Sequence, residues 1–147
     1  MKSLSSTQKA YLAGFLDGDG SIYVRAKPNE TYRYGFQIAP YIVLFQSKKD
    51  EDKFKKVCNL IDLGYIRDRK DGILEYTIGK EEAIRSFLKM VTPYLILKEE
   101  QAKLILEILD TKKKVESKNG FFALMKLVDR FRELNYSKKR KFHTLTP

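Results

Sequence analysis

The sequence has very little of the side chains on which most zinc sites and nucleophilic triads depend. Its 147 residues include one cysteine, Cys58, and one histidine, His143. A single cysteine cannot form an internal disulfide, which suits a reducing compartment. One cysteine and one histidine also exclude a structural zinc site within one chain. A Ser-His-Asp triad or a histidine-metal nuclease core has almost no histidine to use.

Long hydrophobic runs are also missing. No apolar stretch approaches the roughly 20 residues that a membrane-spanning helix needs. The N-terminal apolar run is short and interrupted by Gly14, so no secretory signal is evident. We expect an intracellular protein without a membrane partner, from an organelle (chloroplast or mitochondrion) or a prokaryotic cytoplasm.

The charge is strongly unbalanced toward the positive. Twenty-nine lysines and arginines against 19 acids give a net charge of +10 and a pI near 9.6. This balance favours a polyanionic partner, nucleic acid before membrane, although a solvated lysine-rich surface is the alternative. With 43% apolar residues, the chain has enough material for a core. We expect one domain over residues 1–147.

The most informative segment is an apolar helical run, Tyr11 to Gly20, that ends in two acids flanked by glycines. The helix dipole is negative at that end, so Asp19 needs a nearby cation. Ala10, Gly14 and Gly18 recur every four residues, which leaves one helix face almost bare. Two such helices could touch along this face and bring their acidic tips together.

The hydrophobic pattern predicts an α+β protein. Ser5 and Gln8 have the spacing of a capping box and open the first helix. The predicted order is helix, two strands, helix, two strands, helix and then extra helices, with no internal repeat. The expected elements are a helix at about 5–17, strands at 21–26 and 32–45 around a turn at 27–30, a helix after Ser47 with Phe54, Val57 and Ile61 inward, a hairpin of 65–69 and 73–78, and helices at 80–91, 98–109 and 121–134, with a basic loop at 112–114.

Alternation along the strands separates an apolar sheet face from a polar one. Pro40 inside the long strand implies a bulge, a bend or an edge position. The polar face is rich in residues that read bases, since arginine suits guanine and glutamine suits adenine. An ordinary solvated sheet face is the more common alternative, but with the net charge we favour a DNA groove. The polar-face residues are Tyr23, Arg25, Lys27, Arg33, Gln37, Tyr41, Arg67, Arg69, Glu75 and Thr77.

Three other interpretations of the acidic tip are weaker. A calcium loop of the EF-hand type needs glycine at its sixth position and glutamate at its twelfth, where this chain has Ile22 and Pro28. A plain helix stop explains the glycines but not two acids at the negative end. A nuclease pattern of an acid followed by Glu-x-Lys finds Glu51 and Lys53, but no Pro-Asp precedes them.

The segment LAGFLDGDG, residues 12–20, closely resembles the LAGLIDADG motif of homing endonucleases. The resemblance continues through 27–29, 64–69 and 93–98, and points to single-motif, homodimeric, intron-encoded members. It covers roughly residues 10–110 and is loose from about 112 onward. The core is therefore placed at about 5–110, with the C-terminal helix and basic tail at 111–147.

The resemblance implies an αββαββα core whose antiparallel four-stranded sheet binds the DNA major groove. Motif helices pair two copies through Ala10, Gly14 and Gly18. Such a homodimer cuts both strands of a long, near-palindromic site and leaves short 3′ overhangs. By position, Asp19 binds Mg²⁺ together with the Gly18 carbonyl, and two metals can stabilise the attacking and leaving oxygens together.

Further roles come from the same resemblance. Gln46 falls where the family orients water, or else caps a strand end. Lys98 falls where the family places a basic residue near the cleaved phosphate, or else is a solvent lysine. A basic residue expected early in the second helix is replaced by Asp50, with Lys49 a weak substitute. Asp17 caps or orients the helix end rather than binding metal.

The resemblance agrees with the polar sheet face as the DNA-contacting set. Lysine runs at 112–114 and 138–141 are expected to contact phosphates, although the second run also spells a nuclear-import patch. The alternative function is a non-cleaving nucleic-acid binder, such as a maturase with intron RNA as its partner or a repressor on the same scaffold. A basic α+β scaffold with no site is the third possibility.

Overall fold

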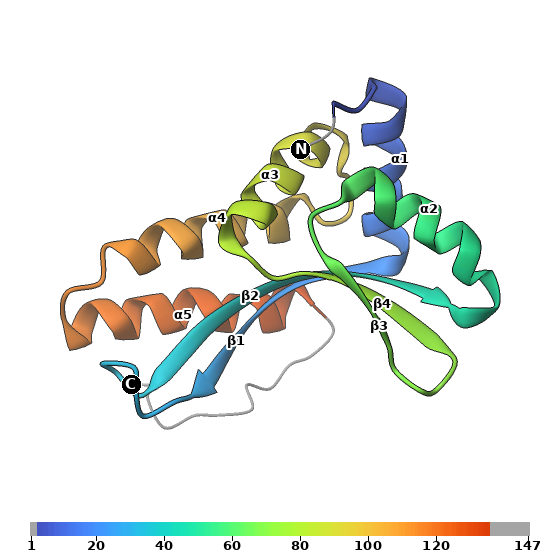
Figure 1. The fold of residues 1–147 in the computed structure, drawn as a ribbon. Coiled ribbons are helices and arrows are strands. Elements are labelled where there is room, and N and C mark those ends of the chain that lie inside the picture. The colour runs from blue at the N-terminus through green and yellow to red at the C-terminus, as the bar shows by residue number, and fades with distance from the viewer. Residues whose placement is uncertain (1–2, 136–147) are drawn as a thin grey trace. The chain divides into compact units, whose positions relative to one another are not determined.

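The computed structural model describes residues 3–135 and confirms the α+β class (Figure 1). One four-stranded antiparallel sheet has the strand order β1-β2-β4-β3. Short 3₁₀ helices at Lys48–Asp50 and Thr92–Tyr94 precede α2 and follow α3. The elements are α1 (Ser6–Asp19), β1 (Gly20–Pro28), β2 (Phe36–Ser47), α2 (Glu51–Ile61), β3 (Tyr65–Asp68), β4 (Ile73–Ile78), α3 (Glu81–Val91), α4 (Glu99–Lys113) and α5 (Lys118–Leu134).

Contacts divide the chain into two compact units, each of which is continuous in space but not in sequence. The first contains the chain up to Ile22 together with Tyr41–Glu99. The second contains Tyr23–Pro40 together with the chain from Glu100 onward. A single domain over 1–147 stays a prediction beside this division.

Helix α1 begins as its sequence predicts and ends two residues later than expected. The Ser5 amide donates to Gln8 Oε1 at 3.0 Å, and the Gln8 amide donates to Ser5 Oγ at 3.1 Å, which completes the capping box. The helix continues through Asp19, where the Gly20 amide donates to the Leu16 carbonyl. A Cβ at position 20 would lie 2.6 Å from Leu16 Cδ1 and 2.8 Å from Leu16 O. Only glycine lets the chain pass from helix to strand so closely.

In the first unit, α1, α2 and α3 lie on one side of the β3–β4 hairpin (Figure 1). Helix α1 buries Leu12, Ala13 and Leu16, and Phe15 stacks on Phe54 of α2 at 6.0 Å between ring centroids. Helix α3 buries Ala83, Ile84, Phe87, Leu88 and Val91, the face that its periodicity predicts.

Helix α2 differs from its prediction in its N-terminal cap and in one of its buried residues. Ser47 caps the 3₁₀ turn rather than α2 itself, since its hydroxyl accepts from the Lys49 amide at 3.2 Å. Phe54 and Ile61 are buried as expected, but Cys58 takes the third buried place and Val57 is half-buried. Burial raises the pKa of the Cys58 thiol to about 12, so this side chain behaves as a small apolar residue.

The β3–β4 hairpin matches its prediction. Leu74, Tyr76 and Ile78 are buried, and the alternate residues of β4 are half-buried. The Tyr76 hydroxyl accepts from the Leu63 amide at 2.8 Å and the Gly64 amide at 2.7 Å, which fixes the entry into β3. Gly64 itself lies so close to β4 that a Cβ would stand 2.1 Å from the Thr77 carbonyl oxygen.

Pro40 sits where β2 has no pairing with β4. The register between these strands runs from Ile42 opposite Ile78 to Ser47 opposite Ile73. The missing amide of Pro40 therefore removes no bond from this ladder, and the expected bulge, bend or edge position stays a prediction.

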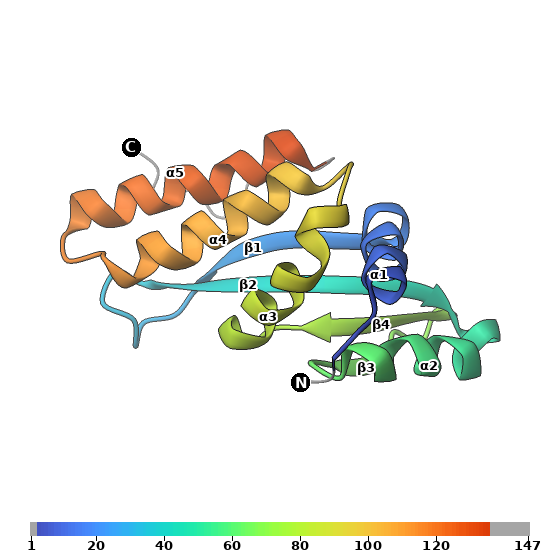
Figure 2. The same ribbon diagram turned by 90° about the horizontal axis from the view of Figure 1, so that it is seen from above.

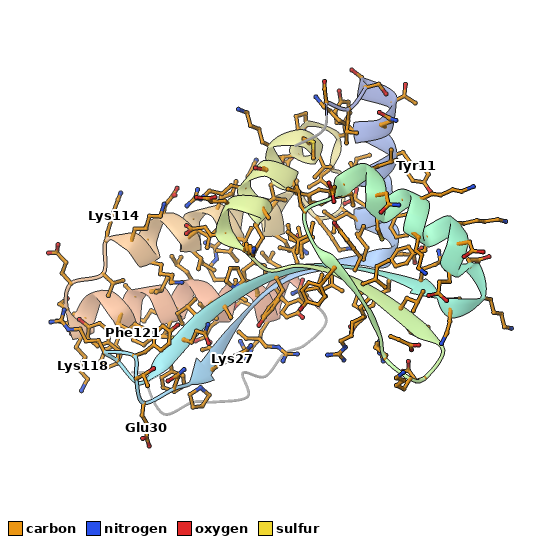
Figure 3. All side chains as sticks on the ribbon, viewed as in Figure 1. Tyr11, Lys27, Glu30, Lys114, Lys118 and Phe121 are labelled. Atoms are coloured by element: carbon orange, nitrogen blue, oxygen red, sulfur yellow. The ribbon has the colours of Figure 1, made fainter. Side chains whose placement is uncertain are left out.

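In the second unit, the connection between β1 and β2 is longer than predicted. Strand β1 continues through Lys27 and Pro28, and β2 begins at Phe36 rather than at residue 32. Asn29 Oδ1 accepts from both the amide and the hydroxyl of Thr31, and Gly35 adopts a φ of 81°. This turn chemistry overrides the β-forming tyrosines, so Arg33 and Tyr34 lie in the turn. Tyr34 stacks on Phe121, labelled in Figure 3, with 5.0 Å between centroids.

Helices α4 and α5 lie side by side in the second unit (Figure 2). Helix α4 runs on to Lys113, so the predicted loop at 112–114 is largely helix. Lysines are favourable in a last helical turn because they oppose the dipole. Lys112 Nζ donates to the Ile38 carbonyl at 3.3 Å. Ser117 caps α5 through the Gly120 amide, which moves its start to Lys118.

No helix within residues 3–135 combines the length and the apolar character required to cross a bilayer.

Replacing Gly64 with alanine tests the close approach of β3 to β4. The added methyl group forces the backbone apart, so Gly64→Ala should lower the free energy of unfolding by about 2 kcal/mol. Gly79→Ala is the matched control, because its Cβ would lie 3.8 Å from the Tyr41 ring, an ordinary contact. Urea unfolding of both variants measures the difference, and equal midpoints would contradict the steric argument.

Candidate functional site

The tip of α1 presents one free-standing carboxylate. Asp19 is exposed, as is Gly18 beside it, and Gly20 then starts β1. Residues 3–135 contain no cluster of three or more His, Cys, Asp or Glu side chains arranged to hold a metal ion. A cation bound at Asp19 therefore needs further ligands from backbone carbonyls, a second chain or a bound substrate.

The other acid of the motif is fully engaged with backbone amides. Asp17 Oδ2 accepts from the amides of Ile96 at 2.8 Å and Leu97 at 3.1 Å, and Oδ1 accepts from Lys98 at 3.0 Å. Three such bonds occupy this carboxylate, in line with its interpretation as a residue that orients the helix end. We call this arrangement the Asp17 clasp.

Lys98 adds a side-chain contact to the clasp and places a positive charge at the negative end of the α1 dipole. Its Nζ donates to the Asp17 carbonyl at 2.7 Å, within the last turn of α1. A cation at this position opposes the negative end of the dipole, as the sequence pattern required of a residue near Asp19. The side chain is half-buried and stands immediately before α4 rather than inside its first turn.

Gln46 lies near the end of β2, opposite Leu74 of β4. It is half-buried, and its Oε1 accepts from the Ser47 amide at 2.8 Å. This contact matches the strand-capping interpretation. The water-orienting role stays a prediction.

Polar residues of β3 and β4 carry matched charges. Arg67 stands opposite Glu75, with Arg67 Nε 3.3 Å from Glu75 Oε1. Arg69 pairs with Asp71 of the hairpin turn at 2.9 Å. The Arg67 side chain is 67% exposed beside this pair, so much of its guanidinium-bearing side chain faces solvent.

In β1 the alternation follows the predicted parity. Ile22, Val24 and Ala26 are buried, whereas Arg25 is exposed and lies over the Tyr23 ring at 5.5 Å. Lys27, Gln37 and Tyr41 are half-buried.

One prediction about strand faces needs correction. Arg33 belongs to the turn, where its guanidinium lies 5.3 Å from the Tyr34 ring centroid, so strand alternation does not orient it. The even positions of β2 are not its only buried ones, because Ala39 and Val43 are buried as well. The lysine run at 138–141 lies outside the described residues.

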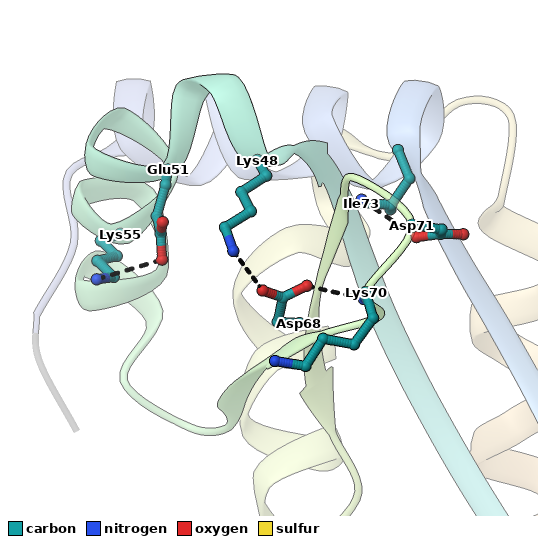
Figure 4. A network of polar contacts seen from close by, with 7 residues as sticks. All are labelled: Lys48, Glu51, Lys55, Asp68, Lys70, Asp71 and Ile73. Atoms are coloured by element: carbon teal, nitrogen blue, oxygen red, sulfur yellow. Dashed lines mark hydrogen bonds and ion pairs between the residues drawn. The ribbon is translucent and has the colours of Figure 1, made fainter.

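An ion pair between β3 and the 3₁₀ turn escaped sequence reasoning. Lys48 Nζ lies 2.6 Å from Asp68 Oδ2, and Asp68 Oδ1 accepts from the Lys70 amide at 2.8 Å (Figure 4). The hydrogen bond with Lys48 lowers the pKa of Asp68, and the same bond raises the pKa of Lys48. Twenty positions separate the partners, and no spacing rule connects them.

Asp50 occupies the position where the family resemblance implies a basic residue. It is exposed and ends the 3₁₀ turn, with Lys49 exposed beside it. The Lys49 amide donates to Ser47 Oγ within the turn, and the substitute role of its side chain stays a prediction.

Comparison with known proteins decides the family. The profile of the LAGLIDADG endonuclease family matches residues 12–104. The chain belongs to the LAGLIDADG endonuclease family. It is 36% identical over 132 residues to DNA endonuclease I-CreI of Chlamydomonas reinhardtii, which covers 89% of this chain and 80% of that protein. It is 30% identical over 131 residues to DNA endonuclease I-CvuI of Chlorella vulgaris, with 89% and 81% covered.

A solved structure supports the same fold. The homing endonuclease I-CvuI, crystallised with the I-CreI target and magnesium with the DNA uncleaved, matches with a TM-score of 0.85 and 29% identity. The match covers 92% of this chain and 87% of that one. In this LAGLIDADG endonuclease, the motif covers the last part of α1 and the first residue of β1, Gly20, and its Asp19 is exposed.

Removing Lys48 should raise the pKa of Asp68 toward its ordinary value. The shift stays incomplete because the Lys70 amide still donates to the carboxylate. Since the folded pKa is lowered, the pair stabilises the protein above the ordinary pKa of 3.8 and ceases to do so as pH falls through the folded value. Carboxyl ¹³C NMR titration of Lys48→Met measures this, with Lys49→Met as the control. An unchanged Asp68 titration in Lys48→Met would show that the pair does not form in solution.

Proposed function

We propose that this chain is a site-specific homing endonuclease that hydrolyses both strands of double-stranded DNA as a homodimer. The observation that carries the proposal is the exposed Asp19 carboxylate at the tip of a helix whose neighbouring face is bare. Relatives named as DNA endonucleases, similar over nine-tenths of the chain, support this activity.

The dimer follows from the bare face of α1. Ala10, Gly14 and Gly18 are exposed, and a Cβ added at Gly14 or Gly18 would meet nothing within 4 Å. A second α1 can therefore approach to backbone contact and bring the two Asp19 carboxylates together. Each chain has one motif, so each active site takes residues from both copies.

The residues at the tip fit a magnesium ion. Magnesium prefers hard oxygen ligands and keeps several waters, so it needs few protein ligands. Asp19 supplies one carboxylate and Gly18 the next backbone carbonyl, since the carbonyls of Leu16 and Asp17 already accept from Gly20 and Lys98. When bound, such a cation stabilises negative charge on the oxygens of the reacting phosphodiester.

Two further side chains serve the reaction around the phosphate. Lys98 brings a positive charge to the end of α1, where it stabilises charge that develops on the phosphate oxygens. Gln46 orients the attacking water through its amide. The products carry short 3′ overhangs.

The polar sheet face reads the sequence of a long, near-palindromic site. Arg67 offers its terminal amino groups to guanine, while Glu75 holds its Nε. Arg25, Lys27, Gln37 and Tyr41 of β1 and β2 also contact the DNA, as does Arg33 in the turn between these strands. Lys113 and Lys114 supply phosphate contacts.

Replacing Asp19 tests the catalytic assignment. Asp19→Asn should reduce cleavage by at least about 1,000-fold because the amide is a poor ligand for magnesium, while target binding remains. Asp52→Asn, an exposed acid of α2, is the control and should cleave normally. The measurement is single-turnover cleavage of a plasmid target. The plasmid carries the host sequence obtained by joining the two DNA segments that flank the reading frame. Full activity of Asp19→Asn would overturn the assignment. Absence of cleavage by the wild type, combined with tight binding to intron RNA, would support a maturase instead.

Filling the bare face tests the dimer. Gly14→Leu should raise the dimer dissociation constant by at least about 100-fold, because its side chain separates the two helices. Lys53→Leu, which adds the same side chain at an exposed position of α2, is the control. Sedimentation over a range of concentrations measures both variants. A Gly14→Leu variant that stays dimeric would refute close helix packing.

A further inference from the structure

The two most exposed large apolar residues described in the structure are neighbours. Ile96 is 82% exposed and Leu97 is 71% exposed, whereas Leu95 before them is buried. They connect the 3₁₀ turn after α3 to the start of α4. An adjacent pair of aliphatic side chains in water indicates a surface that another molecule covers.

This segment is held rigidly rather than free to fold inward. The Asp17 clasp engages the amides of Ile96, Leu97 and Lys98, and the Leu95 amide donates to the Thr92 carbonyl at 3.2 Å. Four consecutive amides are thus fixed. The side chains of Ile96 and Leu97 stay on the surface because their backbone is anchored to α1.

Helical geometry places the segment beside the bare face. At about 100° per residue, Asp17 lies about 60° around the α1 axis from Gly14, and Tyr11 lies about 60° away on the opposite side. Tyr11 is 54% exposed and projects from α1 (Figure 3). The bare face is therefore flanked by Tyr11 on one side and by the segment bound to Asp17 on the other.

We propose that Ile96, Leu97 and Tyr11 form the apolar walls that receive a second copy of this chain, and that this contact fixes Lys98 in its catalytic position. The proposal rests on the homodimer proposed above. A second copy is the occupant because the two Asp19 residues can meet only if the ends of both α1 helices face each other. Asp17 binds the segment of Ile96, Leu97 and Lys98 to that helix end, so this segment then lies at the interface.

The clasp links assembly to chemistry through adjacent residues. Lys98 follows Leu97 directly, and both its amide and its Nζ bond to Asp17. Covering Ile96 and Leu97 restrains the backbone that carries Lys98. Asp17 is thus a positioning residue, which holds the interface and the lysine in one arrangement.

The double substitution Ile96→Ser with Leu97→Ser tests the surface. Both side chains are exposed, so the variant should fold, as circular dichroism can check. In a two-fold interface each substitution acts twice, and the dimer dissociation constant should rise by about 100-fold. Tyr65→Ser, which removes a 61% exposed side chain from β3, should leave assembly unchanged. An unchanged dimer dissociation constant in the double variant would overturn the proposal. A double variant that stays dimeric but loses binding to lipid vesicles or to target DNA would also overturn it, because the surface would then serve that partner and not a second copy.

Asp17→Ala tests the link to Lys98. It should weaken the dimer and, at concentrations where the dimer is complete, lower kcat by about tenfold or more with the target dissociation constant unchanged. Asp17→Glu should recover part of kcat. Normal kcat in the complete Asp17→Ala dimer would refute the positioning role.

Cleavage and dimerisation, measured together, distinguish the endonuclease activity from the dimer surface. If the wild type cleaves DNA and the double variant stays dimeric, the surface is wrong and the endonuclease stands. If the wild type cleaves no DNA but the double variant dissociates, the surface stands and the endonuclease is wrong.

Discussion

The carboxylates at the negative end of α1 need positive charge or hydrogen-bond donors from another segment of the chain. The geometry at the tip of α1 depends on how the chain supplies them. The negative end of α1 receives four donors from one segment: three amides on the Asp17 carboxylate and the Lys98 ammonium on the Asp17 carbonyl. This arrangement satisfies one acid completely. It leaves Asp19 exposed on a helix end that these four donors already compensate.

Local features of the fold could be predicted from the sequence because neighbouring residues determine them. The capping box of Ser5 and Gln8, the hairpin around Lys70 to Gly72 and the inward face of α3 depend on residues a few positions apart. The motif also placed Asp19 at the end of the first helix, where α1 does end. Alternation failed at Arg33, where Asn29 and Gly35 impose a turn on residues with high strand propensity.

What could not be predicted depends on distant partners. The clasp joins Asp17 to residues about 80 positions away, and Lys48 meets Asp68 across two elements. Neither pairing has a spacing signature. The length of α4 was missed for a different reason, because a lysine run resembles a solvated loop until its charges are seen to oppose a helix dipole.

The turn between β1 and β2 satisfies its own hydrogen bonds. Asn29 and Gly35 bond to each other through the backbone, Tyr32 bonds to both through its backbone, and Asn29 also binds Thr31 through its side chain. These hydrogen bonds use neither the Glu30 side chain, which projects outward (Figure 3), nor the Arg33 side chain, which lies 5.3 Å from the Tyr34 ring centroid. Residue 30 can therefore be exchanged at almost no cost in stability, and residue 33 at the cost of its contact with Tyr34. A DNA endonuclease that adapts to a changed target sequence would find permissive positions in this turn.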